Sequence, residues 1–357
     1  MKSFADIVRP TPLIHEDRAR GNIAKMATKA RKLGLQFRPH FKTHQSVAIG
    51  EWFRDEGVRS ITVSSLGMAA YFVAAGWDDI TVAFPFNPRE SALAGELAGA
   101  IRLGLLVDGP ETLAAVAALA APVRVWIKID TGFGRVGIPW DRGETVRSLA
   151  QTVNEKGLEF AGILTHNGAS YFAENPEGVR ASHAESLARM RAVAESIGDG
   201  AISVGDTPSC ILSEDFRGVQ EIRPGNFVFF DLMQQAMGVC REEEIAMVLA
   251  CPVSAVYQDR VMLYGGAVHF SKDTIEMKGR RIYGCLADGI FGAIDKASSL
   301  IALSQEHGSL LPGPAAAKLR VGDLAWVYPA HSCLSADLHS HYRSFEGGFI
   351  PKWPGGR

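Results

Sequence analysis

The feature that most constrains the fold is a regular alternation of short apolar runs with amphipathic segments, extending from Pro12 to about Asp231. The apolar runs have the length and composition of buried strands, and the segments between them repeat apolar residues at helical spacing. Strict alternation of this kind predicts parallel β/α units. Their number favours a (β/α)8 barrel of the TIM type over an open sheet.

Nine strands are expected for the eight places of such a barrel, so we expect the first to lie outside it. The expected strands are 12–15, 36–41, 60–63, 80–83, 103–107, 123–129, 158–165, 201–204 and 220–222. The expected helices include 18–33, 66–75, 111–119 and 181–197.

The pattern changes after Met237, where β-like runs are separated by glycine-containing turns. These runs are 250–257, 260–263, 281–286 and 323–328. We therefore predict an α/β chain with two domains: a barrel over 11–239, and a smaller β-rich domain formed by 1–10 and 240–357.

Composition excludes several functional classes. The chain has 37 Lys and Arg against 39 Asp and Glu, so its formal net charge of −2 gives no indication of nucleic acid or an acidic membrane as partner. No apolar run is long enough for a membrane span, and the first residues do not form a signal peptide. The 5 cysteines are odd in number and lack CxxC spacing, which favours reduced thiols and a cytoplasmic enzyme.

A lysine, Lys42, stands where the extended run 36–42 gives way to a helical pattern that begins near Gln45. At that point of a β/α unit a side chain projects into the mouth where barrel enzymes place their chemistry. An amine there can form a Schiff base with an aldehyde cofactor if its neighbours depress its pKa, and Arg38 and His40 are candidates to do so. A solvated surface lysine is the common alternative.

Two further strand ends carry candidate side chains. The glycine-rich segment 130–137 follows an apolar strand and places Arg135 on the barrel rim. His166 ends another strand, with Tyr171 shortly after it. A solvated arginine in a turn and a structural histidine are the alternative interpretations.

Two segments after late strands are candidates for binding phosphate. Residues 204–209 lead into a possible helix start at Thr207, with free amides and hydroxyls for an anion. Residues 221–227 place the amides of Gly225 and Asn226 on the rim, and the late loops of such barrels frequently hold phosphate. Each segment alone is a common turn. Together with Lys42 they indicate a phosphorylated aldehyde cofactor.

The last candidate is the pair His331 and Cys333. An imidazole and a thiol two residues apart in an extended segment point the same way and could share a borderline-soft cation such as zinc. Two protein ligands leave open positions, which a catalytic metal requires. A core cysteine beside a surface histidine is the alternative.

In combination these segments resemble the fold-type III enzymes that depend on pyridoxal 5′-phosphate (PLP). They are most similar to the D-serine dehydratase and D-threonine aldolase family within the alanine racemase-like superfamily. The resemblance spans nearly the whole chain. It rests on the segments 38–44, 130–137, 205–208, 223–226, 304–308 and 329–333, together with the strand that ends at His166.

The resemblance implies a role for each matching position. Lys42 would be the Schiff-base lysine, Arg135 would donate to the phenolic oxygen of PLP, and His166 would lie against the pyridine ring. Thr207, Gly225 and Asn226 would hold the phosphate, and Tyr171 belongs to the same cofactor-binding set.

Other implications concern the pyridine nitrogen and the metal. Arg223 matches the position that meets this nitrogen in the racemases. His331 and Cys333 match a metal pair, with zinc expected and manganese or magnesium as alternatives. Two positions depart from the pattern: Phe227 stands where tyrosine is usual, and 264–267 replace an Asp-Ala-Gly type segment.

The implied activity is that of a PLP- and metal-dependent lyase acting on a small D-configured β-hydroxy amino acid. A dehydratase that releases a 2-oxo acid and ammonia is favoured because residue 333 is cysteine. An aldolase that yields glycine and an aldehyde is the alternative. An amino-acid racemase and a non-catalytic PLP carrier are further alternatives, and the family implies a homodimer.

Overall fold

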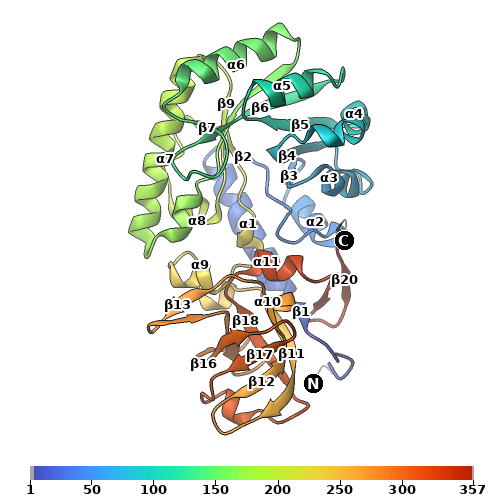
Figure 1. The fold of residues 1–357 in the computed structure, drawn as a ribbon, viewed down its shortest axis with the longest axis vertical. Helices are drawn as coiled ribbons and strands as arrows, with labels where there is room; N and C mark the ends of the chain where they lie inside the picture. Colours follow the sequence, from blue (N-terminus) through green and yellow to red (C-terminus); the bar gives the residue numbers. More distant parts are fainter. Residues whose placement is uncertain (1–3, 356–357) are drawn as a thin grey trace. The chain divides into compact units, whose positions relative to one another are not determined.

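The computed structural model describes residues 4–355, and its contacts divide the chain into two compact units (Figure 1). The barrel unit comprises 25–42, 50–225 and 353–355, and the β-rich unit comprises 4–24, 43–49 and 226–352. This division assigns 11–24, 43–49 and 226–239 to the β-rich unit, which differs from the predicted limits. The domain limits, 11–239 for the barrel and 1–10 with 240–357 for the β-rich domain, stay a prediction.

Within the described residues, eight parallel strands form the barrel in the order β2-β10-β9-β8-β6-β5-β4-β3, with the short β7 (Ile138–Pro139) paired to β6. The remaining edge is closed by a parallel bridge between His40 and Thr62. Their bounds are β2 Gln36–Phe37, β3 Ile61–Val63, β4 Asp79–Pro85, β5 Arg102–Val107, β6 Val123–Asp130, β8 Glu159–Leu164, β9 Ala201–Val204 and β10 Glu221–Ile222. The predicted barrel is confirmed.

Helices follow most of these strands, as the alternating pattern predicts. Their bounds are α1 Glu16–Lys32, α2 Val47–Asp55, α3 Leu66–Val73, α4 Ser91–Ala100, α5 Pro110–Ala117, α6 Gly143–Glu155, α7 Pro176–Ile197 and α8 Thr207–Leu212. Helix α3 begins where the Ser65 hydroxyl accepts from the amide of Met68, and α7 begins where Asn175 accepts from Gly178. Such caps satisfy amide groups that have no partner inside the helix.

The barrel interior combines apolar packing with one buried ionic network. Leu106, Trp126, Ala161 and Leu164 form a buried cluster. The fully buried guanidinium of Arg38 lies 2.6 Å from a carboxylate oxygen of Glu221 and 2.6 Å from one of Asp79. Two carboxylates thus compensate the Arg38 charge inside the barrel.

In the β-rich unit, the largely antiparallel sheet has the order β12-β17-β16-β15-β18-β11-β1-β19-β20. A second pairing between β12 and β11 joins the first six of these strands into a ring. Its first strand, β1 (Thr11–Ile14), pairs antiparallel with β11 and parallel with β19. The first predicted strand therefore lies outside the barrel, as expected.

The other strands of this unit are β11 Met247–Val256, β12 Val261–Tyr264, β13 Ile275–Met277, β14 Arg280–Ile282, β15 Gly284–Ala287, β16 Ile294–Leu303, β17 His307–Leu310, β18 Leu324–Pro329, β19 His341–Ser344 and β20 Phe349–Pro351. Its short helices are α9 Leu232–Ala236, α10 Ala267–Phe270 and α11 Ser332–Asp337. The strand predicted over 281–286 is divided at Tyr283 into β14 and β15. Strands β13, β16, β17, β19 and β20 were not predicted.

Candidate active site

The predicted cofactor residues of the barrel unit follow the carboxyl ends of its strands. Lys42 lies in a turn after β2, and its side chain is exposed. The strand predicted over 36–41 is shorter, because β2 ends at Phe37 and Pro39 has no amide hydrogen to continue it. Arg135 follows β6, His166 follows β8, Thr207 follows β9 and Arg223 follows β10. Parallel strands bring these five loops to one end of the barrel.

The electrostatic environment shows that these groups lie close together. The pKa of His40 is well below its ordinary value because burial disfavours the charged ring, with added repulsion from Lys42 and Arg223. The pKa of His166 is likewise well below normal because of burial and then the charges of Lys42, Arg135 and Lys128. Both imidazoles are therefore neutral at pH 7 within a strongly positive region.

The basic side chains Lys42, Lys128, Arg135 and Arg223 form the cationic cluster of the barrel mouth. Lys128 is the member of this cluster that was not predicted from the sequence. It lies near the end of β6 and is only 5% exposed. Burial, with repulsion from Arg223 and Arg135, lowers the pKa of its amine to about 7, although Asp130 acts in the opposite direction. A lysine in the otherwise apolar run 125–129 was the available signal.

The loop that carries Arg135 is ordered by one carboxylate. Asp130 accepts hydrogen bonds from the amides of Gly132, Phe133 and Gly134. Gly137 has φ +117°, and a Cβ there would lie 2.9 Å from the amide nitrogen of Asp130. Only glycine fits this return of the chain onto β6, so the Gly-rich motif fixes the loop on which Arg135 stands.

His166 and Tyr171 are tied to the loop after β9. Nδ1 of His166 donates to the carbonyl of Gly205 at 2.6 Å, which leaves Nε2 as the unprotonated nitrogen of the neutral ring. The hydroxyl of Tyr171 accepts from the amide of Thr207 at 3.3 Å. A Cβ on Gly205 would lie 2.9 Å from Cβ of Arg223, so glycine permits the close approach of these loops.

Arg223 is buried and held in one orientation by its neighbours. Its Nε donates to the hydroxyl of Ser203 at 2.7 Å, and a second nitrogen donates to the carbonyl of Thr165. Burial lowers its pKa to about 10 although Glu221 opposes this, so the group stays a cation at pH 7. Gly225 follows it directly, before the turn of 3-10 helix at Asn226–Val228.

The predicted metal pair lies in the β-rich unit. His331 is the N-cap residue of α11 and Cys333 lies in its first turn, so this segment is not the extended one that was predicted. Nδ1 of His331 donates to Oδ2 of Asp273 at 2.6 Å. Burial disfavours a charged ring, but hydrogen bonds with Asp273 and with the Cys333 thiol outweigh it and raise the pKa of His331 well above normal.

Cys333 is surrounded by polar groups of the same unit. The hydroxyl of Thr43 lies 3.2 Å from its Sγ, and Nδ2 of Asn226 lies 3.5 Å from it. The same Asn226 nitrogen donates to Asp231 at 2.7 Å and to Ser332 at 2.9 Å. The Asn226 side chain is thus bonded beside the thiol, which leaves its backbone as the part available for the predicted phosphate contact.

The donor set at the barrel mouth fits PLP. A lysine can hold the aldehyde, and the cations of Arg135 and Arg223 favour an anionic ligand. The pair His331 and Cys333 offers one imidazole nitrogen and one sulfur, which suit zinc with open positions. Within residues 4–355 no group of three or more His, Cys, Asp or Glu side chains is arranged to hold a metal ion.

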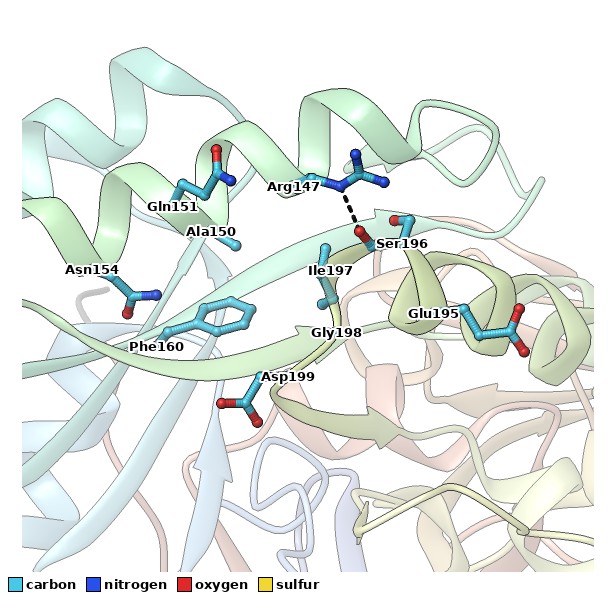
Figure 2. Close-up of a pocket in the computed structure, with 10 residues that line it drawn as sticks. All are labelled: Arg147, Ala150, Gln151, Asn154, Phe160, Glu195, Ser196, Ile197, Gly198 and Asp199. Atoms are coloured by element: carbon cyan, nitrogen blue, oxygen red, sulfur yellow. Dashed lines mark hydrogen bonds between the residues drawn. The ribbon is translucent and has the colours of Figure 1, made fainter.

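A cavity of about 300 Å³ lies elsewhere on the barrel unit (Figure 2). Its lining residues come from α6, the first half of β8 and the end of α7, and include Arg147, Phe160 and Glu195. The Nε of Arg147 donates to the carbonyl of Ser196 at 2.6 Å. None of the cofactor-binding candidates lines this cavity, so it is separate from the chemistry described above.

Comparison with known proteins decides the family. Residues 14–232 match the family model described as alanine racemase, N-terminal domain, and residues 246–344 match that of a putative serine dehydratase domain. The chain is also 30% identical to D-threo-3-hydroxyaspartate dehydratase from Delftia sp. (strain HT23), over 96% of both chains. This chain belongs to the fold-type III PLP-dependent lyases of the D-serine dehydratase and D-threonine aldolase family. The resemblance found in its motifs is confirmed.

Other members of this lyase family match over most of the chain. The D-serine dehydratase of Dictyostelium discoideum is 28% identical over 93% of this chain and 92% of its own. The D-threonine aldolase of Arthrobacter sp. is 28% identical over 89% of this chain and 84% of its own.

The solved structure of the Delftia dehydratase superposes with a TM-score of 0.91 at 28% identity, covering 99% of this chain and 100% of that one. A cysteine-to-alanine variant of that dehydratase has been solved in a metal-free form. In the described part of our lyase, no helix combines the length and hydropathy needed to cross a membrane.

Proposed function

We propose that this lyase eliminates water from a small D-configured β-hydroxy amino acid and releases a 2-oxo acid and ammonia. The observation that carries the proposal is the presence of two sets of groups in one chain. Lys42 stands in the cationic cluster of the barrel mouth, and His331 and Cys333 form a hydrogen-bonded imidazole and thiol. The relatives that match over most of the chain include two dehydratases and one aldolase.

Lys42 would hold PLP through its ε-nitrogen, and Arg135, His166, Tyr171, Thr207, Arg223, Gly225 and Asn226 would complete the cofactor site. PLP when bound supplies an electron sink for negative charge that develops at Cα of the substrate. The neutral ring of His166, fixed by its bond to Gly205, can pack against an aromatic cofactor without adding charge. Arg223 stays protonated, so it can donate to a pyridine nitrogen and keep that nitrogen unprotonated.

Lys42 is also the group that would move the substrate proton. Once released from the cofactor, its amine would take the proton from Cα. The exposed position of Lys42 leaves its amine accessible.

His331 and Cys333 would hold a divalent metal, with zinc preferred over manganese and magnesium because one ligand is a thiolate. The metal would supply Lewis acidity for the departure of the β-hydroxyl, which is otherwise a poor leaving group. Support comes from the donor set itself and from the metal-free cysteine variant of the Delftia relative. The proposal also includes a homodimer in the cytoplasm. Its domain limits are 11–239 for the barrel and 1–10 with 240–357 for the β-rich domain.

The deciding experiment measures products separately. The holoenzyme is incubated with D-serine, D-threonine and D-3-hydroxyaspartate, and 2-oxo acid, ammonia and glycine are assayed in each reaction. A 2-oxo acid with equal ammonia supports the dehydratase. Glycine with an aldehyde would replace it with the aldolase, for which the same residues would suffice. Formation of the L-isomer by metal-free protein would indicate a racemase, and PLP binding without turnover would indicate a carrier.

A further inference from the structure

The loop between α10 and β13 places one carboxylate against the imidazole of His331. Asp273 is the only residue of this loop for which the described structure shows a side-chain bond to His331, at 2.6 Å between Oδ2 and Nδ1. The Asp273 side chain is 19% exposed and the His331 side chain is 20% exposed. An ionised carboxylate only accepts hydrogen bonds, so the proton of this contact belongs to Nδ1.

The surrounding backbone holds this loop in place. The hydroxyl of Ser335 in α11 donates to the carbonyl of Phe270 at 2.9 Å, and the amide of Asp273 donates to the Ser271 hydroxyl at 3.3 Å. Ser271 has φ +75°, a backbone conformation that a residue with a side chain rarely adopts. Such conformations persist where neighbouring contacts over-determine them.

We propose that Asp273 is a positioning residue for the metal site: it fixes His331 with the proton on Nδ1 and with Nε2 as the lone-pair donor toward a divalent cation. A hydrogen bond of this kind selects one ring tautomer, restricts ring rotation and makes the ligating nitrogen more basic. The inference rests on the proposed function, because it needs His331 to bind metal.

An exposed ion pair with Lys272 does not account for the contact between Asp273 and His331. Oδ1 of Asp273 lies 3.2 Å from Nζ of Lys272, and the Lys272 side chain is 87% exposed. The carboxylate therefore uses one oxygen for a solvated pair and the other for the half-buried ring. Removing Lys272 leaves the bond to His331 intact, so this residue supplies a matched control.

The test measures zinc affinity of the PLP-loaded protein by competition with a chromogenic chelator. Asp273→Ala and Asp273→Asn should bind zinc about 10- to 100-fold more weakly than wild type, because a carboxylate bonded to a metal-binding histidine typically contributes this much. Lys272→Met should change the affinity by less than about five-fold, since an exposed ion pair contributes little. His331→Ala and Cys333→Ala each remove a proposed metal ligand, so their zinc affinity gives the value expected when the site is lost.

A second readout separates positioning from folding. The visible absorption of the Co²⁺-loaded protein reports ligand geometry, and it should change in the Asp273 variants but not in Lys272→Met. If Asp273→Ala does not fold, as judged by circular dichroism, the isosteric Asp273→Asn carries the test. Wild-type affinity in both Asp273 variants, or an equal loss in Lys272→Met, would overturn the inference. Wild-type affinity in His331→Ala and Cys333→Ala would instead overturn the metal site itself.

Discussion

The hydroxyl Oγ1 of Thr43 lies 3.2 Å from Sγ of Cys333, and Thr43 directly follows Lys42 in the chain. The residue after the proposed cofactor lysine thus contacts the proposed metal-binding thiol. A hydroxyl that donates to a thiolate stabilises its negative charge and restricts its orientation.

We expect Thr43→Val, which keeps the shape but removes the hydroxyl, to weaken zinc binding by about ten-fold, which is the lower end of what a group bonded to a metal ligand contributes. Thr43→Ser retains the hydroxyl and serves as the matched control, with affinity near wild type. The measurement is zinc competition with a chromogenic chelator. Equal affinity in Thr43→Val and Thr43→Ser would show that the contact with Cys333 has no part in metal binding.

Lys42→Ala should abolish the covalent attachment of PLP. Borohydride reduction of the wild-type holoenzyme should leave a phosphopyridoxyl group on the peptide that contains Lys42, as detected by mass spectrometry. Lys128→Ala is the control, because Lys128 lies in the same cationic cluster yet is buried and donates to the carbonyl of Ile129. A label on residue 128, or a label that survives Lys42→Ala, contradicts the assignment.

Removal of the metal should stop the elimination while PLP stays bound. Dialysis against a strong chelator should reduce lyase activity to background, and zinc or manganese should restore it, because the departing hydroxyl needs a Lewis acid. The PLP absorbance and the melting temperature, measured on the same samples, control for cofactor loss and unfolding. Full activity in the chelated protein would remove the metal from the mechanism.

The buried amine of Lys128 should give the PLP-free protein a distinctive pH dependence. Its pKa is lowered from 10.5 to about 7 by folding, so between these values the unfolded chain holds a proton that the folded chain lacks. The free energy of unfolding therefore rises with pH across this window, by about 1.4 kcal/mol per pH unit.

Lys128→Met should lose this contribution. Between about pH 7.5 and pH 9.5 the wild-type protein should gain about 2 kcal/mol relative to the variant, as measured by urea unfolding. Lys318→Met, a change at an exposed lysine, should run parallel to wild type. A constant difference between wild type and Lys128→Met across this range would show that the amine is not perturbed.

The buried network around Arg38 should be a major stabilising element of the barrel. Glu221→Gln removes one of the two carboxylates that compensate Arg38 and also weakens the 2.6 Å bond from Ser203. We expect a loss of about 3–5 kcal/mol in the free energy of unfolding, because a buried charge is left under-compensated. Glu144→Gln breaks the exposed pair with Arg147 and should cost under about 1 kcal/mol. Similar losses of unfolding free energy in Glu221→Gln and Glu144→Gln would show that burial does not make the Arg38 network more stabilising than an exposed pair.

The barrel could be predicted because each of its strands and helices has a recognisable pattern of apolar residues in its own segment of the sequence. Runs such as 103–107 and 123–129 are apolar and short, and they appear as β5 and β6 within a residue of the expected limits. The β-rich unit was predicted only in outline. Strand β16 has two charged residues, Asp295 and Lys296, among its first four positions, so the first half of its sequence lacks a clear apolar run.

Some candidate residues could be predicted from the sequence and others could not, and the difference has a physical reason. Lys42, Arg135 and His166 each follow a strand, and parallel topology alone brings strand ends together. Asp273 and Thr43 carry no such signal, because their importance lies in which side chain each one meets. Arg38 shows the opposite case: its place beside Lys42 suggested a role at the mouth, yet its side chain points to Glu221 and Asp79.

The sequence by itself determined the barrel, the order of its functional loops and the family, since periodic burial and glycine-dependent turns are local properties of the chain. Tertiary structure alone decided which partners those side chains have. It tied His331 to Asp273 across 58 positions, Thr43 to Cys333 across 290 and Arg38 to Glu221 across 183. Hydrogen bonds between residues so distant depend on how separate elements pack, and no local pattern records that packing.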